Sequence, residues 1–99
     1  MSILKTYELR FLASALNEWT TLDTAVRAQF RRKLAERLDA PHVPAARLSG
    51  LDHCYKINLP ALGYRLAYQV DDNVVTVTVV SVGKRARSAA YVAALTRLK

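Results

Sequence analysis

The sequence predicts an α+β fold in which helices cover one face of a small antiparallel sheet. Between residues 11 and 39 apolar side chains recur every three or four positions, the spacing of amphipathic helices. From residue 55 to residue 82 they alternate with polar side chains, the spacing of half-buried strands. Because only short turns separate the last three strands, we expect an antiparallel meander. The expected order is strand, two helices, three strands and helix, within one domain of residues 1–99.

The first half of the chain is expected to form one strand and two helices. The strand is predicted over residues 2–9, and the first helix over residues 11–19, where apolar residues return at helical intervals. The second helix is predicted over residues 23–39, and Pro41 and Pro44 end it. Its apolar stripe consists of Val26, Phe30, Leu34 and Leu38.

The second half is expected to supply strands at residues 55–59, 64–70 and 74–82, followed by a short helix at residues 88–98. Matching the apolar faces of the first hairpin pairs Leu59 with Tyr64, Ile57 with Leu66, and Tyr55 with Tyr68. A two-residue turn at Asp72–Asn73 would then pair Leu66 with Val79, and Tyr68 with Val77. The opposite face of the sheet would carry Lys56, Asn58, Arg65, Gln69, Thr76 and Thr78.

The chain is basic, with 15 Lys and Arg against 8 Asp and Glu and a net charge of +7. Residues 47–99 hold eight of these cations and only three acids, so an anion site is expected there. A polyanionic partner such as RNA explains such a balance, because bound phosphates release counterions. The alternative is a basic protein whose charges are merely solvated.

The predicted polar face brings Lys56 and Arg65 together, and Lys84, Arg85 and Arg87 follow the last strand. Tyr91, on the final helix, adds an aromatic ring at the margin of this cationic surface. Such a surface suits an RNA backbone with one base available for stacking. For Arg27, Arg31 and Arg32 we favour the solvated back of the second helix, although contact with ribosomal RNA stays open.

Other chemistries lack the residues that they need. One cysteine, Cys54, forms neither an internal disulfide nor a multi-thiolate metal site, and its strand position favours a small buried residue. No carboxylate pair or zinc spacing is present, so we expect no metal and no cofactor. His42 and His53 are a less favoured acid–base pair. The N-terminus carries no signal segment and no apolar run has membrane-spanning length, so we expect a cytoplasmic protein without membrane contact.

The remaining chemistry is cleavage of RNA by its own 2′-hydroxyl. That reaction needs a base for the hydroxyl proton, cations for the charge on the pentacoordinate phosphate, and an acid for the leaving 5′-oxygen. Arginine suits the middle role, because its charge is permanent and its fork binds two phosphate oxygens.

The chain resembles the RelE family of bacterial toxin–antitoxin toxins along nearly its whole length, and it is nearer to RelE than to the wider superfamily. The matching segments are residues 16–19 (Leu-Asn-Glu-Trp), 33–34, 47–50, 54–57 (Cys-Tyr-Lys-Ile), 63–70 (Gly-Tyr-Arg-Leu-Ala-Tyr-Gln-Val) and 81–85 (Ser-Val-Gly-Lys-Arg), with Arg87, Ser88 and Tyr91. Their order and spacing carry the resemblance. It implies a compact antiparallel sheet with helices, as in small microbial ribonucleases.

The resemblance also implies a function. RelE-like toxins enter the ribosomal A site on the small subunit, among ribosomal RNA, and cut messenger RNA there by 2′-hydroxyl attack without metal. By motif, Lys56 matches a lysine of the catalytic set, Arg65 and Arg85 match transition-state arginines, and Tyr91 matches a tyrosine that stacks on or orients a nucleotide. Lys84 and Arg87 match RNA contacts. A cognate RelB-like antitoxin is the implied partner, and operator DNA is bound only through that complex.

One position departs from the family pattern of Lys-x-Lys in the first hairpin strand, because Asn58 replaces the second lysine. Asn58 can contact RNA but cannot take a proton. Proton removal then falls to Lys56 or to solvent. Two alternatives follow: a protein that blocks translation or acts as a co-repressor without cutting RNA, and a gyrase inhibitor of the wider superfamily.

Overall fold

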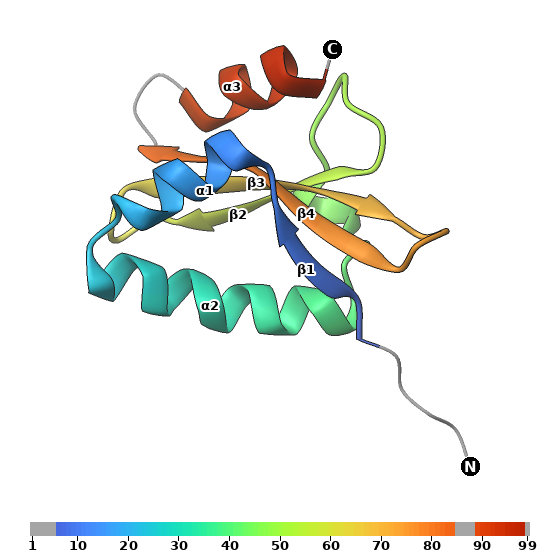
Figure 1. Ribbon diagram of the computed structural model, residues 1–99, viewed down its shortest axis with the longest axis horizontal. Helices are drawn as coiled ribbons and strands as arrows, with labels where there is room; N and C mark the ends of the chain where they lie inside the picture. The colour runs from blue at the N-terminus through green and yellow to red at the C-terminus, as the bar shows by residue number, and fades with distance from the viewer. Residues whose placement is uncertain (1–5, 85–88, 99) are drawn as a thin grey trace.

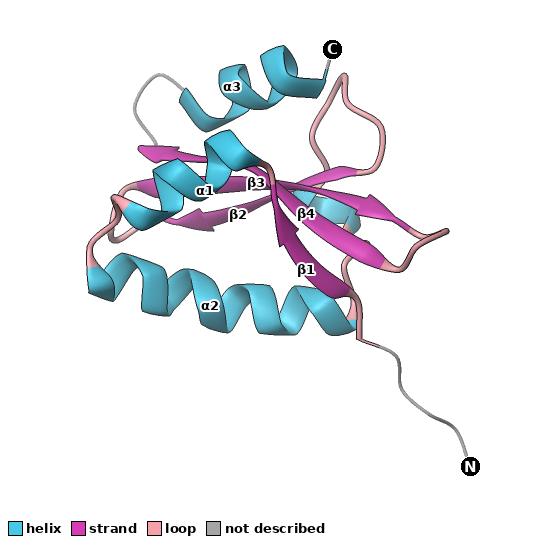
Figure 2. Ribbon diagram, viewed as in Figure 1, coloured by secondary structure: helices cyan, strands magenta, loops and turns pink. Residues whose placement is uncertain are grey.

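A computed structural model describes residues 6–84 and 89–98, and it shows a four-stranded sheet between helices (Figures 1 and 2). The strands are β1 (Glu8–Phe11), β2 (Cys54–Leu59), β3 (Tyr64–Asp71) and β4 (Thr76–Lys84). The helices are α1 (Ala13–Thr20), α2 (Thr24–Asp39) and α3 (Ala89–Leu98), with a short 3₁₀ turn, η1, at Pro44–Ala46. The predicted element order and all three helices are therefore confirmed. The first strand lies later than its predicted range of residues 2–9, of which residues 1–5 are outside the described part.

The sheet has the order β1-β4-β3-β2. Strands β2, β3 and β4 form the predicted antiparallel meander. The prediction of an entirely antiparallel sheet is wrong for β1, which pairs with β4 in parallel. No turn joins β1 to a neighbouring strand, because α1 and α2 lie between it and the meander, so local sequence does not specify its direction.

The first hairpin has the predicted register, with Leu59 opposite Tyr64 and Tyr55 opposite Tyr68. The predicted register of the second hairpin is wrong: Leu66 lies opposite Val82 rather than Val79, and Tyr68 opposite Val79 rather than Val77. Two features cause the shift. The turn contains four residues, 72–75, and a β-bulge at residues 79–81 inserts an extra residue into β4.

The main core lies between α2 and one face of the sheet. The predicted stripe on α2 buries Val26, Phe30 and Leu34 against Tyr68, Ile57 and other strand residues. Trp19 and Ala15 of α1 join the same core. The amphipathic spacing therefore predicted the buried face of α2 correctly, whereas on α1 it also pointed to Leu16, which is 46% exposed.

The prediction that the helices pack on one face is wrong for α3, which covers the opposite face. Ala94 of α3 packs in a second core with Ala67, Val80 and Cys54. Ordinary alternation directs Val79 to the main core and Val80 to the second one, and the bulge lets the next residue, Ser81, face α3 as well, where its Oγ bonds the Ala90 carbonyl. The predicted polar face is thus covered at its centre, where Ser81 is also fully buried, while Asn58 near the β2–β3 turn is exposed and Gln69 and Thr78 at the other end are half-buried.

Within the described residues no helix is both long and apolar enough to span a bilayer.

Candidate functional site

The open end of the sheet brings together three of the predicted site residues. Asn58 lies directly opposite Arg65, and Lys56 is two positions from Asn58 on the same strand, so alternation places all three side chains on one face. This is the face that α3 covers further along. Lys56 and Arg65 are half-buried, and Asn58 is exposed. Two strand-borne cations therefore share one surface with an amide between them.

Tyr91 of α3 closes over this group. Its hydroxyl donates a hydrogen bond of 3.1 Å to Asn58 Oδ1. The guanidinium of Arg65 lies over its ring, with Cζ 4.9 Å from the ring centre, in a cation–π contact. Burial raises the pKa of Tyr91, although Arg65 opposes the shift, so the phenol is protonated at neutral pH. The arrangement offers a fixed cation, a phenolic donor and an aromatic face in one place.

Two contacts from β4 hold the start of α3 close to Arg65. Gly83 pairs with Arg65, and a Cβ added to Gly83 would lie 3.6 Å from the backbone nitrogen of Ala90. The helix backbone therefore lies in van der Waals reach of the strand. Ser81, which is fully buried, donates a hydrogen bond of 2.5 Å from Oγ to the Ala90 carbonyl. Tyr91 follows directly, which is why its ring reaches Arg65.

Lys84 ends β4 and is exposed. It pairs with Tyr64, so alternation places its side chain on the face of the sheet that α2 covers, opposite to the face that carries Arg65. The other predicted site cations, Arg85 and Arg87, lie outside the described residues.

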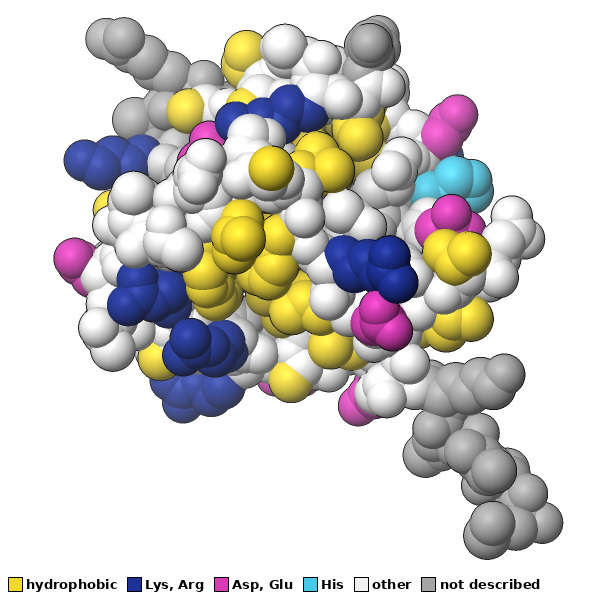
Figure 3. All heavy atoms as spheres, in the orientation of Figure 1, with side chains coloured by type: hydrophobic (Ala, Val, Ile, Leu, Met, Phe, Trp, Pro, Cys, Tyr) yellow, Lys and Arg dark blue, Asp and Glu magenta, His cyan; other side chains and the backbone are white. Residues whose placement is uncertain are grey.

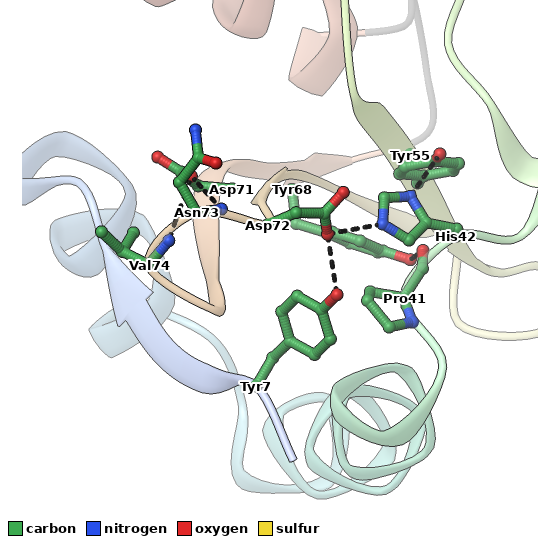
Figure 4. Close-up of polar contacts among 9 residues, drawn as sticks. All are labelled: Tyr7, Pro41, His42, Tyr55, Tyr68, Asp71, Asp72, Asn73 and Val74. Atoms are coloured by element: carbon green, nitrogen blue, oxygen red, sulfur yellow. Dashed lines mark hydrogen bonds and ion pairs between the residues drawn. The ribbon is translucent and has the colours of Figure 1, made fainter. Parts of the chain in front are cut away.

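A second polar network lies at the other end of the β2–β3 hairpin (Figure 4). Asp72 Oδ1 accepts hydrogen bonds from the Tyr7 hydroxyl at 2.7 Å and from His42 Nε2 at 2.8 Å. The bond from His42 first, and that from Tyr7 second, hold the pKa of Asp72 below its usual value. His42 Nδ1 lies 3.0 Å from the Tyr55 hydroxyl. The network thus fastens β1, the α2–η1 loop and the β3–β4 turn together.

This network argues against His42 and His53 as a catalytic pair. Both ring nitrogens of His42 are already hydrogen-bonded. His53 stands at the entrance to β2 with a φ of 59°. Both residues therefore lie at the end of β2 away from Asn58. Among the described residues no three His, Cys, Asp or Glu side chains are grouped as metal ligands.

Beside that network, the buried Tyr68 forms a polar pair with the half-buried Arg37. The Tyr68 hydroxyl donates to the Pro41 carbonyl at 2.7 Å and accepts from Arg37 Nη1 at 2.8 Å. Arg37 Nη1 also donates to the Lys56 carbonyl at 3.1 Å. Arg37 therefore supports the backbone of β2 from beneath the candidate site, a role that sequence spacing did not reveal.

The cations of α2 have local partners as well. Basic side chains gather over the corner where α1 leads into α2 (Figure 3). Arg27 Nη1 donates to the carbonyls of Thr20 and Leu22, and Arg31 lies over the ring of Trp19 at 6.0 Å. These contacts fix the α1–α2 connection. Arg31 and Arg32 are exposed, as expected for the solvent-facing side of the helix, whereas Arg27 is half-buried.

Another contact that the sequence did not predict joins Glu18 of α1 to Arg97 of α3, across the edge of β4. The only sequence signal was the 16–19 segment, which carries Glu18 without indicating its partner.

Comparison with known proteins gives consistent matches in sequence and structure. A family model described as the ParE toxin of the type II toxin–antitoxin system parDE matches residues 9–89. The chain is 49% identical over 92 residues to the mRNA interferase toxin RelE of Escherichia coli strain K12, which covers 93% of this chain and 97% of that protein.

Two solved structures show how far the similarity extends in three dimensions. A free Escherichia coli RelE with two arginines replaced by alanine matches with a TM-score of 0.87 and 46% identity, over 95% of this chain and 99% of that one. The intact RelBE toxin–antitoxin complex of the same organism matches with a TM-score of 0.79 and 49% identity, over 82% and 99% of the two chains. The α+β fold expected from the resemblance is confirmed.

Proposed function

This chain belongs to the family of RelE and ParE toxins of type II toxin–antitoxin systems, and from that premise we propose that it is an endoribonuclease that cuts messenger RNA. The observation that carries the proposal is the Arg65–Tyr91–Asn58 group on the open end of the sheet. It supplies a permanent cation for a phosphate and a ring for a base. The mRNA interferase name of a relative at 49% identity supports the same activity.

In the proposed reaction the 2′-oxygen of a nucleotide attacks the adjacent phosphorus, and the bond from phosphorus to the 5′-oxygen breaks. The 2′-hydroxyl proton leaves to solvent or to the neutral amine form of Lys56, and the 5′-oxygen takes a proton from solvent. Arg65 and Arg85 neutralise the charge of the pentacoordinate phosphate. The protonated Tyr91 stacks on or orients a nucleotide, while Asn58, Lys84 and Arg87 contact the RNA. No step in this scheme requires a metal.

The proposed setting is the A site of a translating ribosome, where the codon lies among ribosomal RNA and the small subunit presents it. We propose that residues 1–99 act as one toxin domain in the cytoplasm, neutralised by a RelB-like antitoxin. That complex, rather than the toxin alone, would bind operator DNA. The match to RelE in a RelBE complex supports an antitoxin partner.

The test is to express the chain in bacteria and to map messenger 5′ ends. The wild type is expected to stop growth and to produce cuts phased to codons in translated messages. Arg65→Ala is expected to lower the cleavage rate on programmed ribosomes about a hundredfold or more, as loss of a transition-state donor does. The upstream fragments are expected to end in 2′,3′-cyclic phosphate and the downstream ones to begin with a 5′-hydroxyl, as 2′-oxygen attack requires.

Arg10→Ala is the matched control. Arg10 is an exposed arginine on β1, paired with Glu8, at the opposite edge of the sheet from β2. It is expected to leave cleavage unchanged. Growth arrest without codon-phased cuts, or equal cleavage by wild type and Arg65→Ala, would contradict the proposal.

A translation blocker that does not cut RNA is the second candidate, and Asn58 favours it because an amide takes no proton. Single-turnover incubation with programmed ribosomes separates the two functions, since a blocker leaves the message intact.

The third candidate, a gyrase inhibitor, is the alternative from the wider superfamily that the sequence left open, and the presence of Arg65, Arg85 and Tyr91 argues against it. It predicts induction of the DNA damage response while messages stay intact.

A further inference from the structure

Glu18 and Arg97 form the best-connected ion pair of the described residues, and the proposed reaction does not use it directly. Arg97 Nη1 lies 2.8 Å from Glu18 Oε1, and Nη2 lies 3.0 Å from Oε2, so the pair is bidentate. The side chain of Arg97 is only 22% exposed and that of Glu18 only 33%. Such a pair holds its geometry more firmly than a single exposed contact.

The pair also supplies hydrogen-bond partners to the backbone at the edge of β4. Strand β1 pairs with β4 only as far as Phe11 opposite Val79, so the next residues of β4 have no neighbouring strand on that side. There, the Val82 N–H donates to Glu18 Oε1 at 3.1 Å, and the Val80 carbonyl accepts from Arg97 Nη1 at 2.8 Å. One carboxylate and one guanidinium therefore replace the hydrogen bonds that a longer β1 would make.

This edge contact fixes the far end of α3. Ser81 fastens the first turn of the helix through the Ala90 carbonyl, and Arg97 fastens its last turn. Tyr91 lies between these two attachments, with its ring against Arg65. A helix held at one end alone pivots about that end, whereas two attachments define its rotation and therefore the direction of the Tyr91 side chain.

We propose that Glu18 and Arg97 are positioning residues, which hold α3 at the rotation that places the Tyr91 ring over Arg65. The expected effect on the cleavage rate rests on the proposed function, whereas the expected effect on the position of the Tyr91 ring does not. It gives a role to the 16–19 segment, which the proposed chemistry leaves without one. Neither residue touches the RNA in this scheme.

The structural consequence is measured by NMR, from the chemical shift of the Arg65 side-chain Nε–H group, which is sensitive to the current of the Tyr91 ring. Tyr91→Leu supplies the reference shift for a missing ring. Arg97→Ala, recorded at a temperature where the variant is folded, is expected to move the Arg65 signal most of the way to that reference. A merely stabilising role would leave the signal of the folded protein at its wild-type position.

The catalytic consequence is measured by single-turnover cleavage on programmed ribosomes at saturating toxin. Arg97→Ala is expected to lower the rate constant at saturation about tenfold, because misplacement of a reacting group costs rate rather than affinity. Arg10→Ala is the matched control, since it removes an arginine from a Glu–Arg pair that is 65% exposed on both sides. It is expected to leave both the Arg65 shift and the rate constant unchanged.

An unmoved Arg65 signal in folded Arg97→Ala overturns the inference, whatever the activity. If that variant does not fold, Arg97→Lys is measured instead. Lysine keeps the charge but lacks the planar fork whose two nitrogens bind the two Glu18 oxygens, so its signal is expected to move in the same direction. An unmoved signal again overturns the inference. If the signal moves while wild-type protein cuts no RNA, the positioning role stands and the proposed function fails.

Discussion

Tyr68→Phe removes one oxygen atom from a buried polar contact of the core. Tyr68 is fully buried, and its hydroxyl lies between the Pro41 carbonyl and the Arg37 guanidinium. One neutral hydrogen bond contributes about 0.5–1.5 kcal/mol and one to a charged group about 1.5–3 kcal/mol. Both partners keep a second bond, Pro41 from the Val43 N–H and Arg37 to the Lys56 carbonyl. We therefore expect the lower end, a loss of about 2 kcal/mol in the free energy of unfolding.

The loss is measured by urea denaturation, followed through the fluorescence of Trp19, the single tryptophan, which lies in the same core. For a chain of this size it corresponds to a fall in Tm of roughly 8–16 °C. The dependence of the free energy on urea is expected to stay the same, because the buried area does not change.

Tyr55→Phe is the matched control. It also removes a tyrosine hydroxyl, but the partner is His42, whose side chain is 41% exposed, so water replaces the bond. A loss below about 1 kcal/mol is expected. The reasoning is refuted if Tyr68→Phe costs no more than Tyr55→Phe.

Three further outcomes are expected. The pKa of Asp72 is lowered in the folded protein, due first to the hydrogen bond from His42, so the ionised carboxylate stabilises the fold above about pH 4 and this stabilisation is lost as the pH falls further. The urea midpoint should therefore drop in acid, and Asp72→Asn should flatten that drop. Parallel plots of urea midpoint against pH for the two proteins would contradict this. Tyr91→Phe keeps the ring but loses the hydrogen bond to Asn58, so single-turnover cleavage should slow by about three- to tenfold. A loss of rate as large as that of Arg65→Ala would show that the ring without its hydroxyl does not support cleavage. Burial raises the pKa of Cys54 to about 11, so iodoacetamide at pH 8 should modify the native protein far more slowly than the urea-unfolded protein, and equal rates would disprove the burial of its thiol.

Local patterns in the sequence predicted most of the elements. The helical stripe on α2 and the alternation of the first hairpin each reflect contacts between residues close in the chain. The parallel placement of β1 depends instead on Glu8 lying beside Thr76, and no local signal encodes that contact. The bulge at Val80 was missed because a Val/Thr strand alternates equally well in two registers.

The candidate site was predictable where it depends on hairpin register. Lys56, Asn58 and Arg65 share a face as expected, and Tyr91 lies beside them. The covering of the remaining polar face by α3 was not predictable, since the small residues of that helix pack equally well on either side of a sheet. The Glu18–Arg97 pair joins residues far apart in the chain. Its role is to bond the backbone at the unpaired edge of β4, and this edge exists only after folding.

The parallel pairing of β1 has a consequence for the order in which the protein folds. Its contacts with β4 close a loop of 68 positions, from residue 8 to residue 76, whereas each hairpin of the meander closes within a few residues. Since long loops lose more chain entropy on closure, the meander should form first and β1 should join last. Backbone amides of β1 are then expected to exchange with solvent by a lower-energy opening than those of β3, and release of this edge would leave the central strands intact.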